Sequence, residues 1–178
     1  FGLDPEKDLL YFRTLHSLAF RVLGLSGAEV LGPKNLKEFS QKIGVDLTVN
    51  GTETIEDEGF AILRSNHPIM RCIDLARNTL QGPMYAYNFI ELNGPYYEFE
   101  HIYNEYLRFK EKNNLKDFTD MMIELADNPS YIPNLDVVFL DEAQDLTPLQ
   151  WKVADNLETN SKRMFVAGDD DQGIYRWA

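Results

Sequence analysis

The sequence predicts an α/β protein in which part of a parallel sheet is joined to a mostly helical insertion. Apolar runs at 136–140 and 162–167 each lead into an acidic loop, and a segment with helix signals lies between them. The region before them repeats its apolar residues mainly at helical spacing. We therefore expect sheet-forming parts at 1–24 and 131–178, with a helical insertion over 25–130.

Composition restricts the class of protein. The chain has 178 residues, of which 44% are hydrophobic, so it can bury a core and is not a disordered chain. Its net charge of −12 argues against nucleic acid as a partner, although a local stacking groove needs no basic surface. The single cysteine, Cys72, allows no disulfide within the chain and favours a reducing cytoplasm.

No membrane segment is expected, because no apolar run approaches the ~20 residues that cross a bilayer. The first residues have neither the basic start nor the apolar stretch of a signal peptide. The chain does not begin with Met, so we expect it to be part of a longer protein.

The first elements have recognisable ends. Leu9–Arg13 is a candidate for a short strand. Thr14 is a good N-cap for the helix that should follow, and Gly24 suits the end of that helix. A second helix is expected over 35–43, ended by Gly44.

The middle of the chain is expected to contain one hairpin and a series of helices. The pair Asn50-Gly51 predicts a hairpin turn between strands at 45–49 and 52–55. Apolar spacing, interrupted by breaks at Asn93-Gly94-Pro95 and Asn128-Pro129, predicts helices near 56–64, 68–80, 96–113 and 115–127.

The end of the chain predicts a strand–helix–strand unit. The run at 136–140 is continuous, as in strands that are buried on both faces of a parallel sheet. Thr147-Pro148-Leu149-Gln150 is a capping box with Pro at the first helical position, and the helix should reach about Glu158. The strand at 162–167 completes the unit.

The candidate site lies in the two acidic loops. In the stretch 137–145, VVFLDEAQD, a predicted strand is followed directly by three carboxylates and an amide. The next strand ends in Gly168-Asp169-Asp170-Asp171-Gln172. Open α/β sheets bind ligands at the carboxyl ends of their strands. Adjacent Asp141 and Glu142 diverge, so one can hold Mg²⁺ through water while the other activates a nucleophile. The alternative is a solvated acidic loop.

Four segments resemble one family. VVFLDEAQDLTPLQ resembles motif II, the Walker B box, of superfamily 1 helicases of the UvrD/Rep type, and VAGDDDQGIYRWA resembles their motif III. TLHSLAFRVLG resembles motif Ib, and DFTDMMIEL resembles a segment that the family often carries as Asp-Phe-Asp-Asp-Leu-Leu. The resemblance implies part of a RecA-like P-loop NTPase sheet (domain 1A), a 1B-like inserted subdomain, and an ATP-dependent DNA helicase or translocase.

The resemblance assigns roles at the nucleotide. Asp141 would hold the Mg²⁺ of Mg-ATP, and Glu142 would be the general base for the attacking water. Gln144 would couple the nucleotide site to the DNA site, and Gln172 would sense the γ-phosphate.

The resemblance also assigns roles on DNA. Tyr175 and Trp177 would meet single-stranded DNA, with Trp177 stacked on a base. Thr14 and His16 would lie beside the DNA backbone; alternatively, Thr14 only caps a helix and His16 is a surface residue. Single-stranded and duplex DNA and ATP are thus the expected partners, and the sequence names no protein partner.

The phosphate-binding loop of the family, G-x-x-x-x-G-K-[ST], is absent from the sequence. The segment GAEVLGPK at 27–34 fails because Pro33 stands at the lysine position, and Asn35 does not restore the Ser or Thr. Motifs IV–VI are absent as well. We expect the 178 residues alone to hydrolyse no ATP.

Alternatives stay open at this point. A helicase-nuclease of RecB-like type would need a nuclease domain elsewhere, and an interaction module would keep the fold without the motor. A two-metal nuclease could be built on Asp141, Glu142 and Asp169–Asp171, and it would not need ATP.

Overall fold

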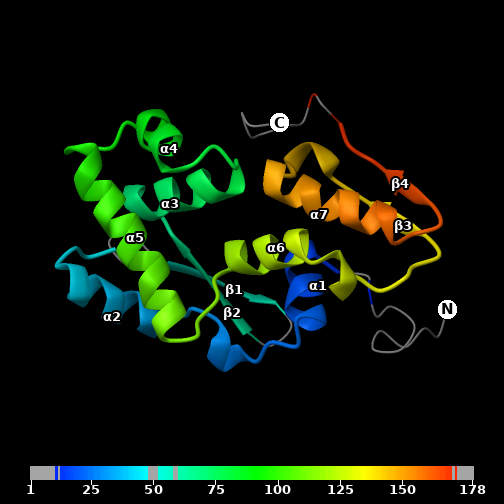
Figure 1. Ribbon diagram of the computed structural model, residues 1–178, viewed down its shortest axis with the longest axis horizontal. Coiled ribbons are helices and arrows are strands. Elements are labelled where there is room, and N and C mark those ends of the chain that lie inside the picture. Colours follow the sequence, from blue (N-terminus) through cyan, green and yellow to red (C-terminus); the bar gives the residue numbers. More distant parts are fainter. Residues whose placement is uncertain (1–10, 12, 48–51, 58–59, 170, 172–178) are drawn as a thin grey trace.

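The computed structural model describes residues 11, 13–47, 52–57, 60–169 and 171. They form an α/β structure rich in helices, with two separate two-stranded sheets (Figure 1). The helices are α1 Leu15–Val22, α2 Pro33–Ile43, α3 Pro68–Asn78, α4 Pro83–Ile90, α5 Tyr96–Lys112, α6 Phe118–Asp127 and α7 Pro148–Thr159. Short 3-10 helices are η1 Gly27–Glu29, η2 Pro129–Tyr131 and η3 Ala143–Asp145, and the strands are β1 Thr52–Asp57, β2 Phe60–Ser65, β3 Val138–Leu140 and β4 Met164–Val166.

The caps at both ends of the helices follow the sequence signals. Thr14 caps α1, and its Oγ1 accepts a hydrogen bond from the Ser17 N–H at 3.2 Å. Gly44 ends α2 at φ 70°, a conformation that glycine adopts without steric cost. Pro33 is the first residue of α2, so the segment GAEVLGPK forms a helix start and no phosphate-binding loop. The strand expected over Leu9–Arg13 lies largely outside the described residues.

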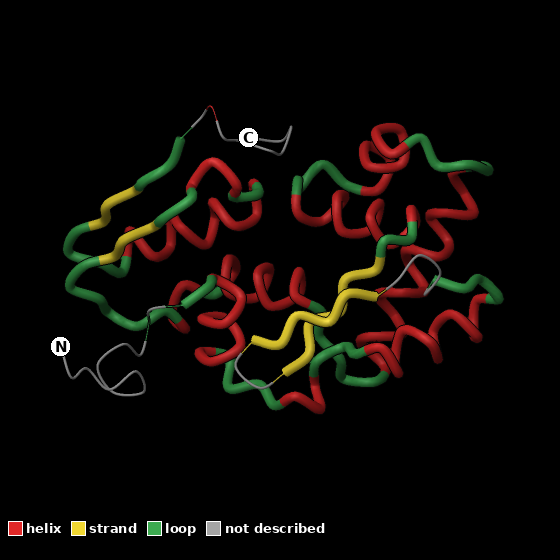
Figure 2. Tube along the Cα trace, turned by 180° about the vertical axis from the view of Figure 1, so that it is seen from behind, coloured by secondary structure: helices red, strands yellow, loops and turns green. Residues whose placement is uncertain are grey.

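The hairpin and the helix after it were predicted wrongly. β1 pairs antiparallel with β2 in a register that joins Thr52 to Ser65 and Asp57 to Phe60. The hairpin therefore joins 52–57 to 60–65, so residues 60–64 form a strand where a helix was expected over 56–64, and the predicted turn at Asn50-Gly51 lies outside the described residues. The partner strand decides this outcome, since a short apolar run is compatible with either a helix or a strand. Figure 2 shows the hairpin running across the back of the molecule.

Two other helices differ from the sequence prediction. α4 was not expected, although Gly82 and Pro83 give it a recognisable start. α6 begins at Phe118 instead of Leu115 because Asp117 is its N-cap, and Asp120 completes the capping box.

The apolar side chains form two large clusters, one in each group of helices, and a small third one around Leu140. The first joins α2, α3, α4 and α5, and its largest fully buried side chains include Phe39 and Tyr106. The second joins α1, α6 and α7 around Met121, Met122 and Val153. The views in Figure 1 and Figure 2 show the same two groups of helices. The domain boundaries at 24 and 130 stay predictions.

The unit at the end of the chain is a parallel strand pair crossed by a helix, as predicted. β3 pairs with β4 in parallel, Val138 to Met164 and Leu140 to Val166, and α7 connects them. Leu140 is buried against α7. The prediction that this strand is buried on both faces is wrong in the described structure: Phe139 is 77% exposed and stacks on Phe165 at 5.1 Å between ring centroids. A single helix covers only one face of two strands.

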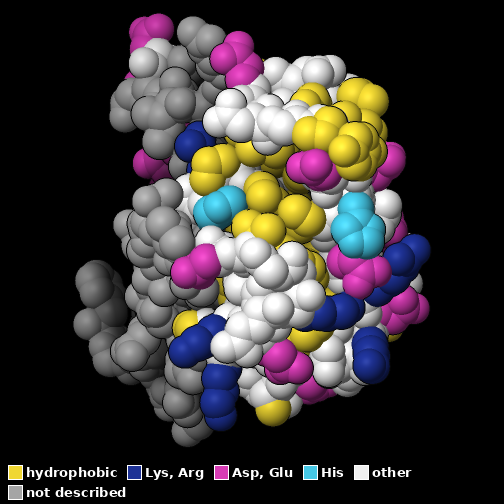
Figure 3. Space-filling model, turned by 90° about the vertical axis from the view of Figure 1, so that its left-hand side faces the viewer, with side chains coloured by type: hydrophobic (Ala, Val, Ile, Leu, Met, Phe, Trp, Pro, Cys, Tyr) yellow, Lys and Arg dark blue, Asp and Glu magenta, His cyan; other side chains and the backbone are white. Residues whose placement is uncertain are grey.

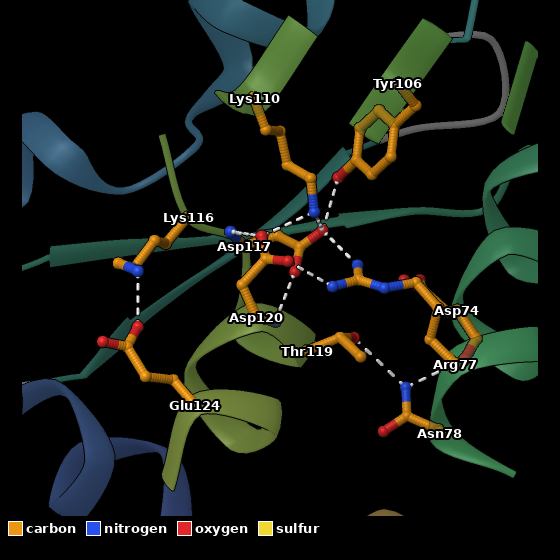
Figure 4. A network of polar contacts seen from close by, with 10 residues as sticks. All are labelled: Asp74, Arg77, Asn78, Tyr106, Lys110, Lys116, Asp117, Thr119, Asp120 and Glu124. Carbon is orange, nitrogen blue, oxygen red and sulfur yellow. Dashed lines mark hydrogen bonds and ion pairs between the residues drawn. The ribbon is translucent and has the colours of Figure 1, made fainter. Parts of the chain in front are cut away.

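A buried ionic network joins α3, α5 and α6 (Figure 4). Arg77 of α3 and Lys110 of α5 both pair with Asp117 and Asp120, at 2.7 Å for Arg77–Asp117 and 2.5 Å for each Lys110 pair. The Tyr106 hydroxyl donates to Asp117 at 2.8 Å. Burial alone would raise the pKa of Asp117, but the charges of Arg77 and Lys110 outweigh it and hold that pKa well below its usual range.

Within the described part of the chain, no helix combines the length and the apolar character needed to cross a membrane.

Candidate functional site

The loop after β3 presents two adjacent carboxylates to solvent. Asp141 and Glu142 follow Leu140 directly, and both are exposed. The Oδ1 atom of Asp141 accepts a hydrogen bond from the Glu142 N–H at 3.0 Å. Glu142 has φ 53° and ψ 40°, a left-handed conformation that few non-glycine residues adopt. Leu80, Glu91 and Asn114 share a positive φ, so the conformation draws attention to Glu142 only together with its place at the end of β3.

Gln144 joins the loops that follow β3 and β4. Its side chain is largely buried, and its Nε2 donates to Glu142 Oε2 at 2.5 Å. Its Oε1 accepts a hydrogen bond from the Asp169 N–H at 3.0 Å. A single amide thereby fixes the orientation of the Glu142 carboxylate relative to the backbone after β4. Because the Gln144 side chain bonds both to the Glu142 carboxylate and to the Asp169 backbone, a movement of the loop after β3 shifts the loop after β4, and the reverse.

The two loops approach each other closely at Gly168. The Ala143 N–H donates to the Ala167 carbonyl at 3.0 Å, and the Ala167 N–H donates to the Leu140 carbonyl at 2.8 Å. A Cβ atom on Gly168 would lie 2.8 Å from Gln144 Oε1 and 3.2 Å from the Gln144 backbone nitrogen. The site therefore requires glycine here. Sequence reasoning missed this role; the glycine that ends the strand at 162–167 was its signal.

The residues of this loop fit a magnesium ion. Mg²⁺ is usually held by one or two carboxylates together with phosphate oxygens and waters. Asp141 supplies one exposed carboxylate at the end of β3, and Glu142 lies beside it. Among the described residues no group of three or more His, Cys, Asp or Glu side chains could hold a metal ion. Asp170, one of the carboxylates of the two-metal alternative, lies outside the described residues.

Asp145 adds an incomplete contact to this loop. Its Oδ1 atom is buried and has no hydrogen-bond donor in the structure. A buried carboxylate oxygen without a donor costs free energy, so a donor from elsewhere would stabilise this loop.

The other predicted site residues fall into two sets. Gln172, Tyr175 and Trp177 lie outside the described residues. Thr14 and His16 lie at the start of α1, where Thr14 is the N-cap. His16 is half-buried, and its ring meets the edge of Phe118 at 5.3 Å between centroids and an interplanar angle of 89°. Both thus have structural contacts in addition to the role on DNA predicted for them.

Comparison with known proteins supplies the family. The family model described as the UvrD/REP helicase N-terminal domain matches residues 5–178. The chain is 26% identical to the ATP-dependent DNA helicase PcrA of Bacillus subtilis, over 98% of this chain and 24% of the relative. It is also 26% identical to the ATP-dependent DNA helicase Rep of Buchnera aphidicola, over 96% of this chain and 26% of the relative.

A more similar but shorter match is a probable DNA helicase II homolog of Mycoplasma capricolum, 37% identical over 43% of this chain and 12% of the relative. No solved structure matches the chain. The chain thus spans about a quarter of the length of the first two curated relatives. Because the family model covers nearly the whole chain, we conclude that this protein belongs to the UvrD/Rep family of helicases, matching its N-terminal domain.

Proposed function

We propose that this chain is part of an ATP-dependent DNA helicase or translocase that couples hydrolysis of Mg-ATP to movement on single-stranded DNA and to unwinding of the duplex. The observation that carries the proposal is the bridge from Glu142 through Gln144 to the backbone of Asp169. It ties the candidate general base to the loop after β4, within the segment that resembles motif III. The names of PcrA and Rep as ATP-dependent DNA helicases support the same activity.

The residues of the loop after β3 have separate tasks in this proposal. Asp141 holds the magnesium ion, which when bound neutralises charge on the phosphates. Glu142 accepts the proton of the attacking water. The hydrogen bond from Gln144 occupies Glu142 Oε2 and leaves the other carboxylate oxygen for that proton. Because Gln144 also holds Asp169, a shift of the loop after β4 would reorient the base.

Contacts with DNA complete the proposal. Gln172 would sense the γ-phosphate, while Tyr175 and Trp177 meet the single strand. A stack of one base on an aromatic ring is worth about 1–3 kcal/mol and is indifferent to sequence, as a motor that moves along any strand requires. It also needs no basic surface, which agrees with the net charge of −12. Thr14 and His16 would lie beside the DNA backbone.

The fold in this proposal is part of domain 1A, a RecA-like sheet, with a 1B-like helical insertion. The parallel pair β3–β4, with the acidic loops at its carboxyl end, supports this assignment. A cytoplasmic location is proposed from the single cysteine and from the helicase relatives.

The test is ATP hydrolysis by the full-length protein, with and without single-stranded DNA, for wild type and Glu142→Gln. We expect DNA to stimulate turnover in wild type. Loss of a general base should lower kcat by roughly 10²–10⁴-fold while nucleotide still binds. Glu158→Gln, an exposed carboxylate on α7, is the matched control and should behave as wild type. A wild-type protein without DNA-dependent turnover would exclude the motor and favour a non-catalytic interaction module.

A further inference from the structure

Helix α4 carries apolar side chains on its inner and its outer side but is buried only on the inner one. Its sequence, PMYAYNFI, contains no charged residue, and the exposed Asn88 is the polar exception on the outer side. The inner side packs well: Ala86 is fully buried, and the Tyr87 ring lies 5.4 Å from Tyr96 and 6.1 Å from Phe99 between centroids. A surface helix normally confines its apolar residues to the side that faces the core. The packing of this chain therefore accounts for half of the helix.

The outer side of α4 exposes large apolar side chains. Met84 is 50% exposed, Tyr85 is 42% exposed and Phe89 is 48% exposed. Tyr85 and Phe89 stack at 5.9 Å with an interplanar angle of 26°. We call these three residues the α4 patch. Figure 3 shows the side of the molecule on which α4 lies, with hydrophobic side chains gathered in its upper part.

The segments before and after α4 add two more exposed apolar residues. Tyr97, at the start of α5, is 67% exposed. Leu80, just after α3, is 45% exposed and has φ 62°. A left-handed conformation is unfavourable for a non-glycine residue, and the exposed Leu80 side chain gains little from burial in the core to offset it. Packing in the core thus does not explain why Tyr97 and Leu80 are apolar residues.

The charges around the α4 patch indicate which kind of partner can bind there. Between Arg77 and Arg108 the sequence has no Lys or Arg, and Glu91, Glu98 and Glu100 are exposed there. Most of the Lys and Arg side chains visible in Figure 3 lie in the lower half of that face. This stretch supplies no cation to neutralise phosphates, so DNA would have to bind the α4 patch by base stacking alone, which the oligo(dT) measurement below tests. A second copy of the same acidic surface would be repelled.

We propose that the α4 patch is a docking site for a protein segment that presents large apolar side chains flanked by Lys or Arg. Exposed aromatic and methionine side chains are enriched in protein interfaces, and their acidic surroundings complement a basic partner. An amphipathic helix with a basic polar side has this chemistry. The proposal concerns a surface apart from the loop after β3 and does not depend on the helicase activity.

The experiment uses the full-length protein and a fluorescein-labelled amphipathic peptide made of Leu and Lys, titrated by fluorescence anisotropy. A peptide of the same pattern made of Leu and Glu tests the role of charge. Tyr85→Ser/Phe89→Ser removes the two aromatic rings of the patch, and Tyr131→Ser removes an aromatic of comparable exposure, 45%, far away in sequence on η2. Circular dichroism verifies that each variant is folded.

Support requires that the Leu/Lys peptide binds and that Tyr85→Ser/Phe89→Ser weakens binding at least about tenfold, as removal of interface hot spots does. Tyr131→Ser should bind as wild type, and the Leu/Glu peptide should bind weakly or not at all. Equal binding by wild type and the double variant would overturn the proposal and assign the peptide to the general negative charge. Loss of self-association or of oligo(dT) binding in the double variant alone would overturn it in favour of a second copy or of DNA.

Discussion

At the scale of single residues, the candidate site depends on two backbone features. Glu142 has a left-handed conformation that directs its carboxylate toward the Gln144 amide. Gly168 has no side chain, which lets the loop after β4 reach the same amide. The left-handed conformation of Glu142 is unfavourable by itself, and the missing side chain of Gly168 only leaves room for a close approach. Together they place the Glu142 carboxylate beside the loop after β4.

Gly168→Ala is expected to damage this arrangement. The added Cβ would lie 2.8 Å from Gln144 Oε1, so the amide must shift and release either Glu142 or Asp169. Overpacking of this kind costs roughly 1–3 kcal/mol. Denaturant unfolding of the full-length protein measures the loss, and DNA-stimulated ATPase should fall as well. Gly27→Ala is the matched control, because nothing lies within 4 Å of its Cβ; equal effects at both glycines would contradict the close approach.

Asp117 gives stability a defined dependence on pH. Its pKa is lowered in the folded protein, so its contribution to stability is present above the unfolded pKa and is lost as pH falls through the folded value. The unfolded pKa of an aspartate is about 3.9. We expect the difference in unfolding free energy between wild type and Asp117→Asn to be constant from pH 7 to about 5 and to shrink below about pH 4. Urea titrations across this range measure it, and a difference that shrinks near neutral pH would refute the assignment.

At the scale of elements, polar contacts join helices that belong to different hydrophobic clusters. α3 and α5 pack in the first cluster and α6 in the second. At the N-terminus of α6, Asp117 and Asp120 form ion pairs with Arg77 and Lys110 (Figure 4). The capping box thus has two tasks, because the same carboxylates begin α6 and attach it to its neighbours.

Arg77→Met is expected to be strongly destabilising. The Arg77 side chain is 4% exposed, and its removal leaves buried carboxylates with only Lys110 as a cationic partner. Breaking a buried pair by removing one partner costs about 3–5 kcal/mol. Lys42→Met is the matched control: Lys42 is 49% exposed in its pair with Glu105 at 2.7 Å, and exposed pairs contribute below about 1 kcal/mol. Thermal or urea unfolding distinguishes them, and similar losses would show that the network adds nothing beyond a surface pair.

At the scale of the whole molecule, the sheet of β3 and β4 is covered by α7 on one face and exposed on the other. Phe139 and Phe165 form a stacked, exposed pair on the face opposite α7, and Val166 is 53% exposed. The carboxylates of the candidate site lie at the end of this same strand pair. The sequence thus combines the candidate site loop with no G-x-x-x-x-G-K-[ST] segment.

The isolated 178 residues are therefore expected to hydrolyse no ATP above the background rate. Asp141 and Glu142 are in place, but the sequence contains no G-x-x-x-x-G-K-[ST] segment to hold the phosphates. A phosphate-release assay with Mg²⁺ and single-stranded DNA measures this, with the full-length protein as the positive control. Turnover by the isolated chain that Glu142→Gln abolishes would refute the prediction.

The fold was predictable wherever a short segment determines its own structure. Thr14 and Thr147 were recognised as helix starts because an N-cap needs only its own side chain and the next turn. The parallel order of β3 and β4 followed from two apolar runs with a helix between them. The acidic loops were identified in the same way, from their position after those strands.

Tertiary structure decided what depends on distant partners. Residues 60–65 are a strand because β1 pairs with them, and no local pattern distinguishes that from a helix. Phe139 is exposed because one helix covers two strands, although its sequence matches a strand buried on both faces. Gly168 and Gln144 meet across twenty-odd positions of the chain, where spacing alone carries no information. The sequence by itself determined the family and the candidate chemistry, since motifs are local; the contacts that hold Glu142 in place were decided by folding, since they join separate loops.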